Sequence, residues 1–166
     1  MISPFKTAEK RGLYELTRPV TRDEILRMAK CLIQKRFTRG EPLTSPAVSK
    51  AYLMLQLAEL EYEAFAIVFL DNQHRILSFE ILFTGTIDSA SIYPREVVKR
   101  TLQLNAKALL LAHNHPSGTP EPSEADRQIT RKLIDSLNLI DVRVLDHFVI
   151  GGSEVTSFAE SGLLSS

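Results

Sequence analysis

Two histidines one residue apart, His113 and His115, stand at the end of an apolar run and are followed by a loop rich in proline. Side chains alternate along an extended strand, so both imidazoles project to the same side and can face one ion. Asp126, where the next helix should begin, can add a carboxylate oxygen. Two histidines and one carboxylate commonly hold a catalytic zinc ion and leave one position open for water. The spacing therefore predicts a Zn²⁺ site formed by His113, His115 and Asp126.

Each of these residues also has an explanation without a metal. A histidine pair at a strand end is often just two polar residues, and Asp126 in the first turn of a helix compensates the helix dipole. Ser123, at the same helix start, is a natural N-cap. The combined string H-x-H-P-x(6)-S-x-x-D favours the metal site, because a string of this length rarely occurs by chance.

The string is similar to the JAMM (MPN+/JAB) metalloprotease motif. Its surroundings resemble the RadC family of that superfamily over roughly Thr44 to Leu164: HNHPSGTPEPSEAD, with Tyr93-Pro94-Arg95-Glu96 upstream and Asp146-His147 downstream. The resemblance implies a cytidine-deaminase-like JAB/MPN fold and a zinc-dependent metallohydrolase of the peptidase or isopeptidase type, with a peptide or protein substrate. RadC-like proteins are also associated with DNA repair, which implies an alternative: a nucleic-acid or partner-binding module without hydrolysis.

A catalytic water needs a base that takes its proton and passes it to the leaving amine. Glu61, Glu63 and Glu80 stand at comparable places, and only the resemblance selects Glu63, because the family's glutamate directly precedes an apolar strand. Ser123 could donate a hydrogen bond to the oxyanion of the tetrahedral intermediate, although its spacing suits an N-cap equally well. His147 is a candidate for supporting the site, but a satisfied core histidine is favoured there.

The motif needs a strand that ends at the histidines and a helix that begins soon after them. Ala106–Ala112 is an apolar strand candidate, and Ser123 opens a helix with an apolar stripe. Ala64–Leu70 is rich in β-branched and aromatic residues and predicts a buried strand that returns over Arg75–Phe83. With a further strand over Val142–Ile150, the pattern predicts an α/β (α+β) fold, a central mixed β-sheet with helices packed on it.

The other expected elements surround this frame. The capping-box spacing of Thr21 and Glu24 starts a helix that ends near Gly40. The remaining expectations are a helix from Thr44-Ser45-Pro46 to about Glu61, a short strand over Thr86–Tyr93, a helix from Pro94 to Asn105, a short strand over Glu154–Thr156 and a helix over Ser157–Gly162, with residues 1–20 irregular.

The chain divides into an N-terminal helical extension, residues 1–43, and a RadC-like JAB/MPN metal-binding domain, residues 44–166. RadC relatives often carry an upstream helix-hairpin-helix module; its glycine-bearing hairpin is missing here, which indicates the short form.

Residues 1–50 contain 11 Lys/Arg and 5 Asp/Glu, against 9 and 15 in residues 51–166. The basic residues could contact nucleic acid. They are scattered without aromatic residues between them, however, which favours a solvated helix face. A salt-dependent DNA titration would distinguish the two.

No apolar run approaches the ~20 residues that span a bilayer, and the first residues have no apolar segment of a secretory signal. A single cysteine, Cys31, excludes an internal disulfide and suits a reducing compartment. We therefore expect a cytoplasmic protein without a membrane partner. A scaffold role without a metal is disfavoured by the intact ligand set, and the oligomeric state does not follow from the sequence.

Overall fold

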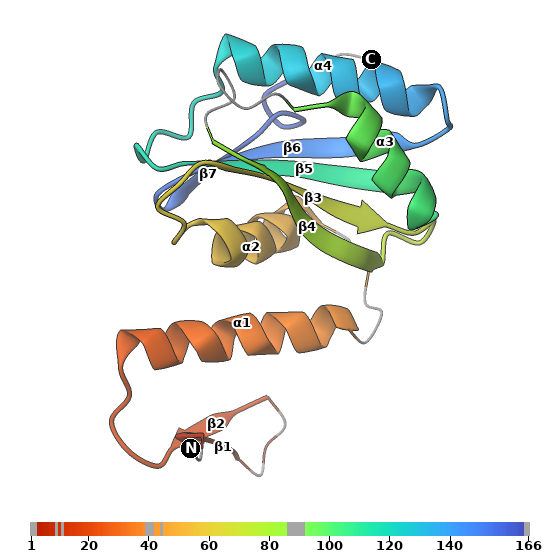
Figure 1. The fold of residues 1–166 in the computed structure, drawn as a ribbon. Coiled ribbons are helices and arrows are strands. Elements are labelled where there is room, and N and C mark those ends of the chain that lie inside the picture. The colour runs from red at the N-terminus through yellow and green to blue at the C-terminus, as the bar shows by residue number, and fades with distance from the viewer. Residues whose placement is uncertain are drawn as a thin grey trace.

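The computed structural model describes residues 3–8, 10, 12–38, 42–43, 45–85 and 92–164. One five-stranded sheet forms its centre, with helices on both faces (Figure 1). The strand order is β4-β3-β5-β6-β7; β5 and β6 are parallel and the other neighbours antiparallel, so the sheet is mixed, as predicted. The strands are β3 (Ala64–Leu70), β4 (Ile76–Thr84), β5 (Ala108–His115), β6 (Arg143–Gly151) and β7 (Glu154–Ser157).

Strand β3 is buried over its whole length, because it lies between two other strands and under helices on both faces. Its side chains alternate between two cores: Ala66 and Val68 contribute to one, and Phe65 and Ile67 to the other. A continuous apolar run is what a strand buried on both faces requires. The predicted bounds of this strand are confirmed.

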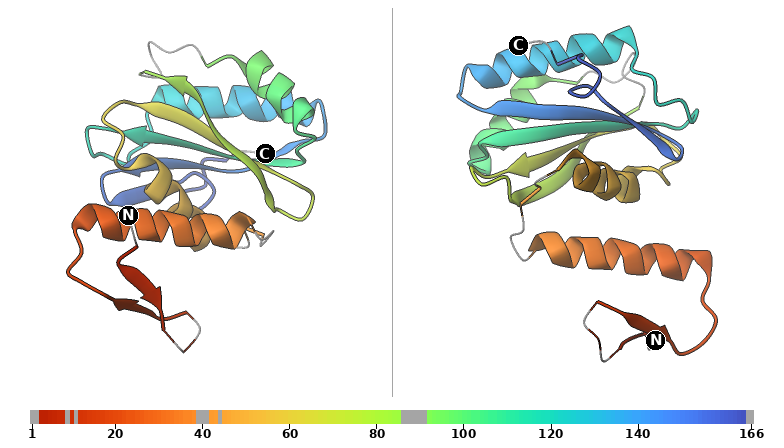
Figure 2. Two further views of the ribbon diagram at one scale, coloured as in Figure 1. Left: turned by 60° about the horizontal axis from the view of Figure 1, so that its bottom comes forward. Right: turned by 180° about the vertical axis from the view of Figure 1, so that it is seen from behind.

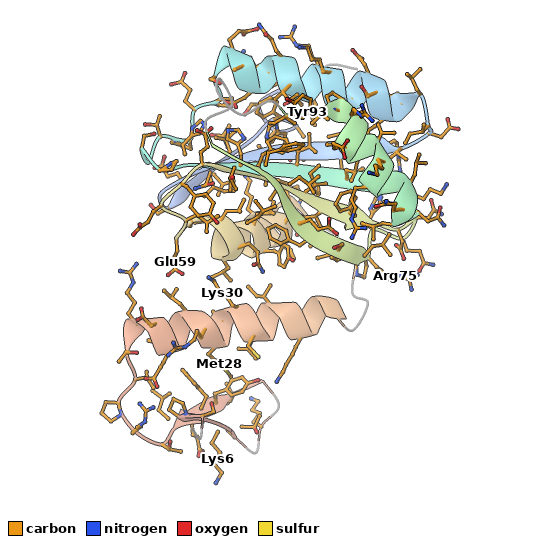
Figure 3. All side chains as sticks on the ribbon, in the orientation of Figure 1. Lys6, Met28, Lys30, Glu59, Arg75 and Tyr93 are labelled. Atoms are coloured by element: carbon orange, nitrogen blue, oxygen red, sulfur yellow. The ribbon has the colours of Figure 1, made fainter. Side chains whose placement is uncertain are left out.

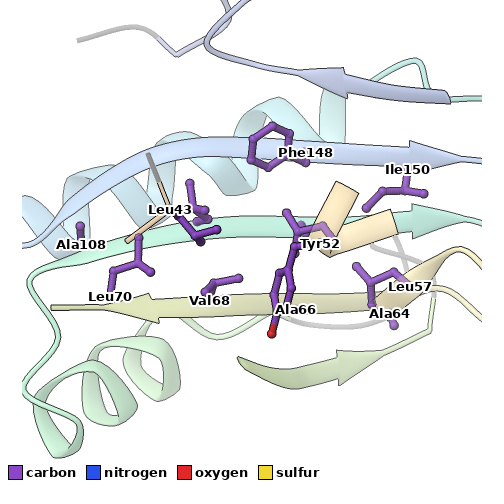
Figure 4. Packing of buried hydrophobic residues seen from close by; sticks show 13 residues of the cluster. Leu43, Tyr52, Leu57, Ala64, Ala66, Val68, Leu70, Ala108, Phe148 and Ile150 are labelled. Carbon is purple, nitrogen blue, oxygen red and sulfur yellow. The ribbon is translucent and has the colours of Figure 1, made fainter. Parts of the chain in front are cut away.

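Helix α2 (Pro46–Leu57) covers one face of the sheet. Its fully buried Leu53 and Leu57, with Tyr52, pack against the small residues of that face (Figure 4). The helix starts as predicted, with Ser45 as N-cap accepting from Val48 N, but it ends at Leu57, before the predicted Glu61. The chain must leave the helix axis there to reach the start of β3.

Helices α3 (Pro94–Gln103) and α4 (Glu124–Asn138) cover the opposite face (Figure 1). Leu133 and Leu137 of α4 are fully buried against the large side chains of β3 and β5. Each such leucine contributes about 1.5–3 kcal/mol by burial. This apolar contact holds the first turn of α4 at the C-terminal end of β5.

The N-terminal part consists of a hairpin, β1 (Phe5–Thr7) and β2 (Tyr14–Leu16), and helix α1 (Arg22–Thr38). The expectation that residues 1–20 are irregular was therefore wrong. Strands of three residues are too short to show a period of two, and the turn between them contains Gly12 at a φ of +88°. Helix α1 starts with the predicted capping box of Thr21 and Glu24.

Helix α1 and the hairpin lie to one side of the sheet and its helices, beyond α2 (Figure 2). Lys30 of α1 lies 3.2 Å from the carboxylate of Glu59, just after α2 (Figure 3). None of the α1 side chains that the structure describes is buried. An exposed ion pair of this kind contributes at most about 1 kcal/mol.

The strand expected over Thr86–Tyr93 falls mostly on residues 86–91, outside the described residues, and Ile92 and Tyr93 are not in a strand. The helix expected over Ser157–Gly162 was wrong: Ser157 ends β7 and turns follow. Asp146 accepts a hydrogen bond from Ala159 N at 2.9 Å, which holds the chain in this turn. Gly40 and Thr44 also lie outside the described residues.

Within the described part of the chain, no helix combines the length and the apolar character that crossing a bilayer requires.

Candidate metal centre

The register of the sheet places three of the predicted residues side by side. Phe65 of β3 pairs with His113 of β5 in antiparallel orientation. Two residues outward, the position of Glu63 therefore faces that of His115, and both project to the same face as Phe65 and His113. This face is the one covered by α4, whose first turn carries Asp126. All four residues meet at the end of β5.

The two imidazoles point at one place. The Nε2 atoms of His113 and His115 lie 2.9 Å apart. Asp126 Oδ1 is 3.1 Å from His113 Nε2, and Asp126 Oδ2 is 3.7 Å from His115 Nε2. Ligand atoms around a tetrahedral zinc ion with bonds of about 2.1 Å lie about 3.4 Å from one another. The three side chains therefore have the spacing that such an ion requires.

Glu63 lies beside the same imidazoles. One carboxylate oxygen of Glu63 and one nitrogen each of His113 and His115 lie within 4.8 Å of one another, and the three residues form a group that could hold a metal ion. Two carboxylates, Glu63 and Asp126, thus flank one histidine pair. They differ in exposure: Asp126 is 1% exposed, whereas Glu63 is half-buried.

One carboxylate oxygen of Asp126, Oδ2, is hydrogen-bonded, and the other, Oδ1, is not. Oδ2 accepts from the backbone N of Ser123 at 2.6 Å and from its hydroxyl at 2.7 Å. Oδ1 is buried and accepts no hydrogen bond from any residue that the structure describes. Buried polar atoms normally have partners. Oδ1 lies 3.1 Å from His113 Nε2 without a hydrogen bond, and an oxygen in this position is suited to binding a cation.

The charge state of Asp126 fits this arrangement. Burial raises the pKa of Asp126, but the neighbouring His113 and the hydrogen bonds from Ser123 lower it more, so that the pKa lies well below its usual value. The carboxylate is therefore ionised at neutral pH. A buried negative charge needs a positive partner, and a metal ion held by the same three side chains would supply one.

His115 is oriented by the loop that follows β5. Its Nδ1 lies 2.8 Å from the carbonyl oxygen of Thr119. A carbonyl oxygen only accepts, so Nδ1 donates to it, and Nε2 is the ring nitrogen that remains for a metal ion beside His113 and Asp126. Nδ1 bonded to a backbone carbonyl is a common arrangement for metal-binding histidines.

That loop rests directly on the end of β6. A Cβ atom added at Gly151 would lie 2.4 Å from Pro120 N and 2.5 Å from the carbonyl carbon of Thr119. Only glycine permits such an approach of two backbones. Gly151 thereby helps to place the carbonyl that orients His115.

Of the three glutamates considered as the base, only Glu63 lies with the imidazoles in the described part of the chain. Glu80 pairs with Ile67, four residues further along β3 than Glu63, which is about 13 Å. There it forms a bidentate ion pair with Arg100, which lowers the pKa of Glu80. Glu61 is exposed.

Ser123 occupies the N-cap of α4 and forms a reciprocal capping box with Asp126. Its hydroxyl donates to Asp126 Oδ2 at 2.7 Å and accepts from Asp126 N at 3.1 Å. The structural role expected for Ser123 is thus present. Its role as an oxyanion donor stays a prediction, for which the hydroxyl hydrogen would have to turn away from Asp126.

Asn114, which points to the opposite face, braces the segment before β3. Its amide donates to the carbonyl of Tyr62 at 2.9 Å and its oxygen accepts from Ala64 N at 2.8 Å. These bonds flank Glu63 on both sides in the sequence. The buried polar residue between the two histidines therefore fixes the backbone that carries the third member of the group.

Sequence reasoning gave too little weight to His147 and did not consider Thr130. His147 is fully buried, and its Nε2 lies 2.9 Å from His113 Nδ1. Thr130 lies one helical turn after Asp126 and contacts His147 Nδ1. The spacing of Asp126 and Thr130 places both on one face of a helix, a signal that could have identified Thr130.

The chain is similar to known proteins over most of its length. The sequence profile of the RadC-like JAB domain matches residues 43–163. A UPF0758 protein of Vibrio campbellii is 59% identical over 138 residues, which are 83% of this chain and 62% of that protein. UPF0758 proteins of Vibrio cholerae and Aliivibrio fischeri are 58% and 54% identical over the same number of residues.

The chain spans less than two thirds of the length of these relatives. The matched profile nevertheless covers β3 to β7, both cores and all four residues of the candidate metal centre. On the profile match and the level of identity, the chain belongs to the RadC-like JAB domain family.

Proposed function

We propose that this protein is a zinc-dependent metallohydrolase that cleaves an amide bond in a peptide or protein. The observation that carries the proposal is the convergence of two imidazole nitrogens and the buried, unbonded oxygen of Asp126 at one place. His113, His115 and Asp126 are the zinc ligands in this proposal. Membership of the RadC-like JAB domain family supports it, as does the similarity of the H-x-H-P-x(6)-S-x-x-D string to the JAMM metalloprotease motif.

Zinc held by these three side chains would lower the pKa of a water toward about 7 and polarise the carbonyl of the substrate. The protein must supply the rest of the chemistry. Asp126 contributes a negative charge whose ionisation is already secured by its neighbours. His113, which is fully buried, and His115, which is partly exposed, form an inner and an outer side of the centre.

Glu63 is the general base and then the general acid in this proposal. It lies beside both imidazoles and is half-buried, so it can contact a water at the centre and also exchange protons with a substrate. It accepts a proton from the attacking water and returns it to the leaving nitrogen. Ser123, whose hydroxyl donates to Asp126 Oδ2, would turn this hydrogen toward the oxyanion.

The test combines zinc analysis with a hydrolysis assay on a mixture of unstructured peptides, with products identified by mass spectrometry. We expect about one zinc per chain and zinc-dependent cleavage. Both should be lost in Asp126→Asn. Asp135→Asn, which changes an exposed carboxylate on the same helix, should leave both unchanged. A protein that refuses zinc at neutral pH, or one that binds zinc and cleaves no peptide bond, would contradict the proposal.

A further inference from the structure

The segment that joins α2 to β3, residues 58–63, carries Glu63 to the candidate metal centre, and packing alone does not hold it there. None of the residues in this segment is buried. Leu60 and Glu61 line a cavity of about 410 Å³ that also borders His115. Because open space lies beside the segment, apolar contacts cannot determine its path, and hydrogen bonds must do so.

The backbone pairing of the sheet stops just before this segment. The pairing of β3 with β5 ends at Phe65 and His113. The next backbone group outward, the N–H of Ala64, donates instead to a side chain, since it lies 2.8 Å from Asn114 Oδ1. The side chain of Asn114 therefore takes over at the point where the backbone of β5 no longer pairs with that of β3.

The amide of Asn114 also binds the chain on the other side of Glu63. Its nitrogen donates to the carbonyl of Tyr62 at 2.9 Å and to that of Leu60 at 3.3 Å. A carbonyl only accepts and a backbone N–H only donates, so the amide has one orientation, in which both its hydrogens are used. Asn114 is 3% exposed, which keeps water from competing for these bonds.

The opposite side of the segment is held by β4. Gly85, directly after β4, donates its backbone N–H to the carbonyl of Glu63 at 2.8 Å. The backbone of Glu63 thus lies between a bond from the β4 side and the bonds of Asn114 from the β5 side. The side chain of Glu63 is left to project toward His113 and His115.

We propose that Asn114 is a positioning residue that holds Glu63 at the histidine pair. This inference rests on the proposed function and adds the side chain that sets the distance between the base and the metal ligands. Strand β5 carries His113 and His115 on one face, and through Asn114 on the other face it fixes the segment that carries the base. A displacement of about 1 Å in such a group lowers a reaction rate by about 100-fold.

Amide hydrogen exchange of the full chain, followed by NMR, tests whether Asn114 holds the segment. Asn114→Leu replaces the amide by an apolar side chain of similar size, and Asn114→Ala is the second variant if leucine prevents folding. We expect the amide of Ala64 to lose its protection in the variant, because its acceptor is gone. The amide of Ile67, in the middle of β3 between two paired strands, should keep its protection.

Hydrolysis by the zinc-loaded chain tests whether this hold serves catalysis. Asn114→Leu should lower kcat by about 100-fold and leave zinc affinity unchanged, because β5 and α4 carry the ligands. A double-mutant cycle with Glu63→Gln separates positioning from general damage. Because Asn114 acts through Glu63, the double variant should be no slower than Glu63→Gln alone.

Thr101→Val is the matched control. Thr101 is also fully buried and donates to a backbone carbonyl, Val97 O at 2.7 Å, but it lies on α3. Its replacement should change neither kcat nor the protection of Ala64. An Ala64 amide that stays protected without Asn114, an unchanged kcat, or losses that add in the double variant would overturn the inference. Exchange is measured without zinc or substrate, so a lack of hydrolysis in the unaltered chain contradicts the proposed function alone.

Discussion

At the scale of single residues, the centre contains two carboxylates beside one histidine pair, and their surroundings assign them different tasks. Asp126 is buried, ionised and fixed at Oδ2 by Ser123, which leaves Oδ1 directed at His113. Glu63 is half-buried at the outer side of the pair. A ligand benefits from rigidity, whereas a proton carrier needs contact with both water and substrate. The difference in burial favours Asp126 as ligand and Glu63 as base.

This division can be tested with two amide substitutions of nearly equal size. Glu63→Gln removes the base and should lower kcat by about 10²–10⁴-fold while the chain still binds zinc. Asp126→Asn removes the anionic ligand and should weaken zinc binding itself. The measurements are zinc stoichiometry and peptide hydrolysis at saturating zinc. If Glu63→Gln loses zinc as readily as Asp126→Asn does, Glu63 is a ligand and the assignment of roles is wrong.

At the scale of elements, the centre depends on where one loop and one helix meet the end of β5. Helix α4 is held by its buried leucines, and the loop is held by contact with Gly151 at the end of β6. The loop places the Thr119 carbonyl beside Nδ1 of His115, and strand β6 places His147 beside Nδ1 of His113. Each imidazole is thus oriented by a different element of the fold.

Gly151→Ala should displace the loop, because the new Cβ would meet the backbone of Thr119 and Pro120 rather than a flexible side chain. We expect a stability loss of about 1–3 kcal/mol from overpacking. Zinc affinity should fall about 10-fold or more, because His115 loses its partner. Chelator competition and thermal unfolding measure the two effects. Ser153→Ala, in the exposed turn nearby, is the control, and unaltered zinc affinity in Gly151→Ala would show that the loop does not orient His115.

The elements that carry the centre were largely predictable, because their patterns are local. The apolar run Ala64–Leu70 and the cap at Ser123 gave β3 and the start of α4. Strand β5 runs further than its apolar residues indicate, through the two histidines, because β6 continues to pair with it as far as His115. Polar residues that stay in a sheet for the sake of a site do not appear in a hydrophobic pattern.

Other parts of the site required the register of the sheet. Nothing local separates Glu63 from Glu61 or Glu80; the pairing of Phe65 with His113 does. His147 looked like an ordinary core histidine, because its contact with His113 joins two strands far apart in the sequence. The resemblance to a known family supplied the choice of Glu63, and the structure now gives the geometric reason for it.

At the scale of the whole molecule, the structure shows a packed sheet covered by helices and, beyond α2, an N-terminal hairpin and helix with exposed surfaces (Figures 1 and 2). The division into residues 1–43 and 44–166 stays a prediction, as does contact of the basic N-terminal residues with nucleic acid. The candidate centre belongs entirely to the sheet domain, and the family profile matches that part alone. Its chemistry can therefore be examined without assigning a task to the extension.

The most direct test of the central claim is X-ray absorption at the zinc edge on the zinc-loaded full chain. The account predicts one zinc with nitrogen and oxygen ligands only, at about 2.0–2.2 Å, including two imidazoles. Replacing either His113 or His115 by alanine should remove one imidazole or the ion altogether. A zinc ion with a sulfur ligand, or one whose two imidazoles persist in both variants, would show that the metal lies elsewhere and would contradict the account.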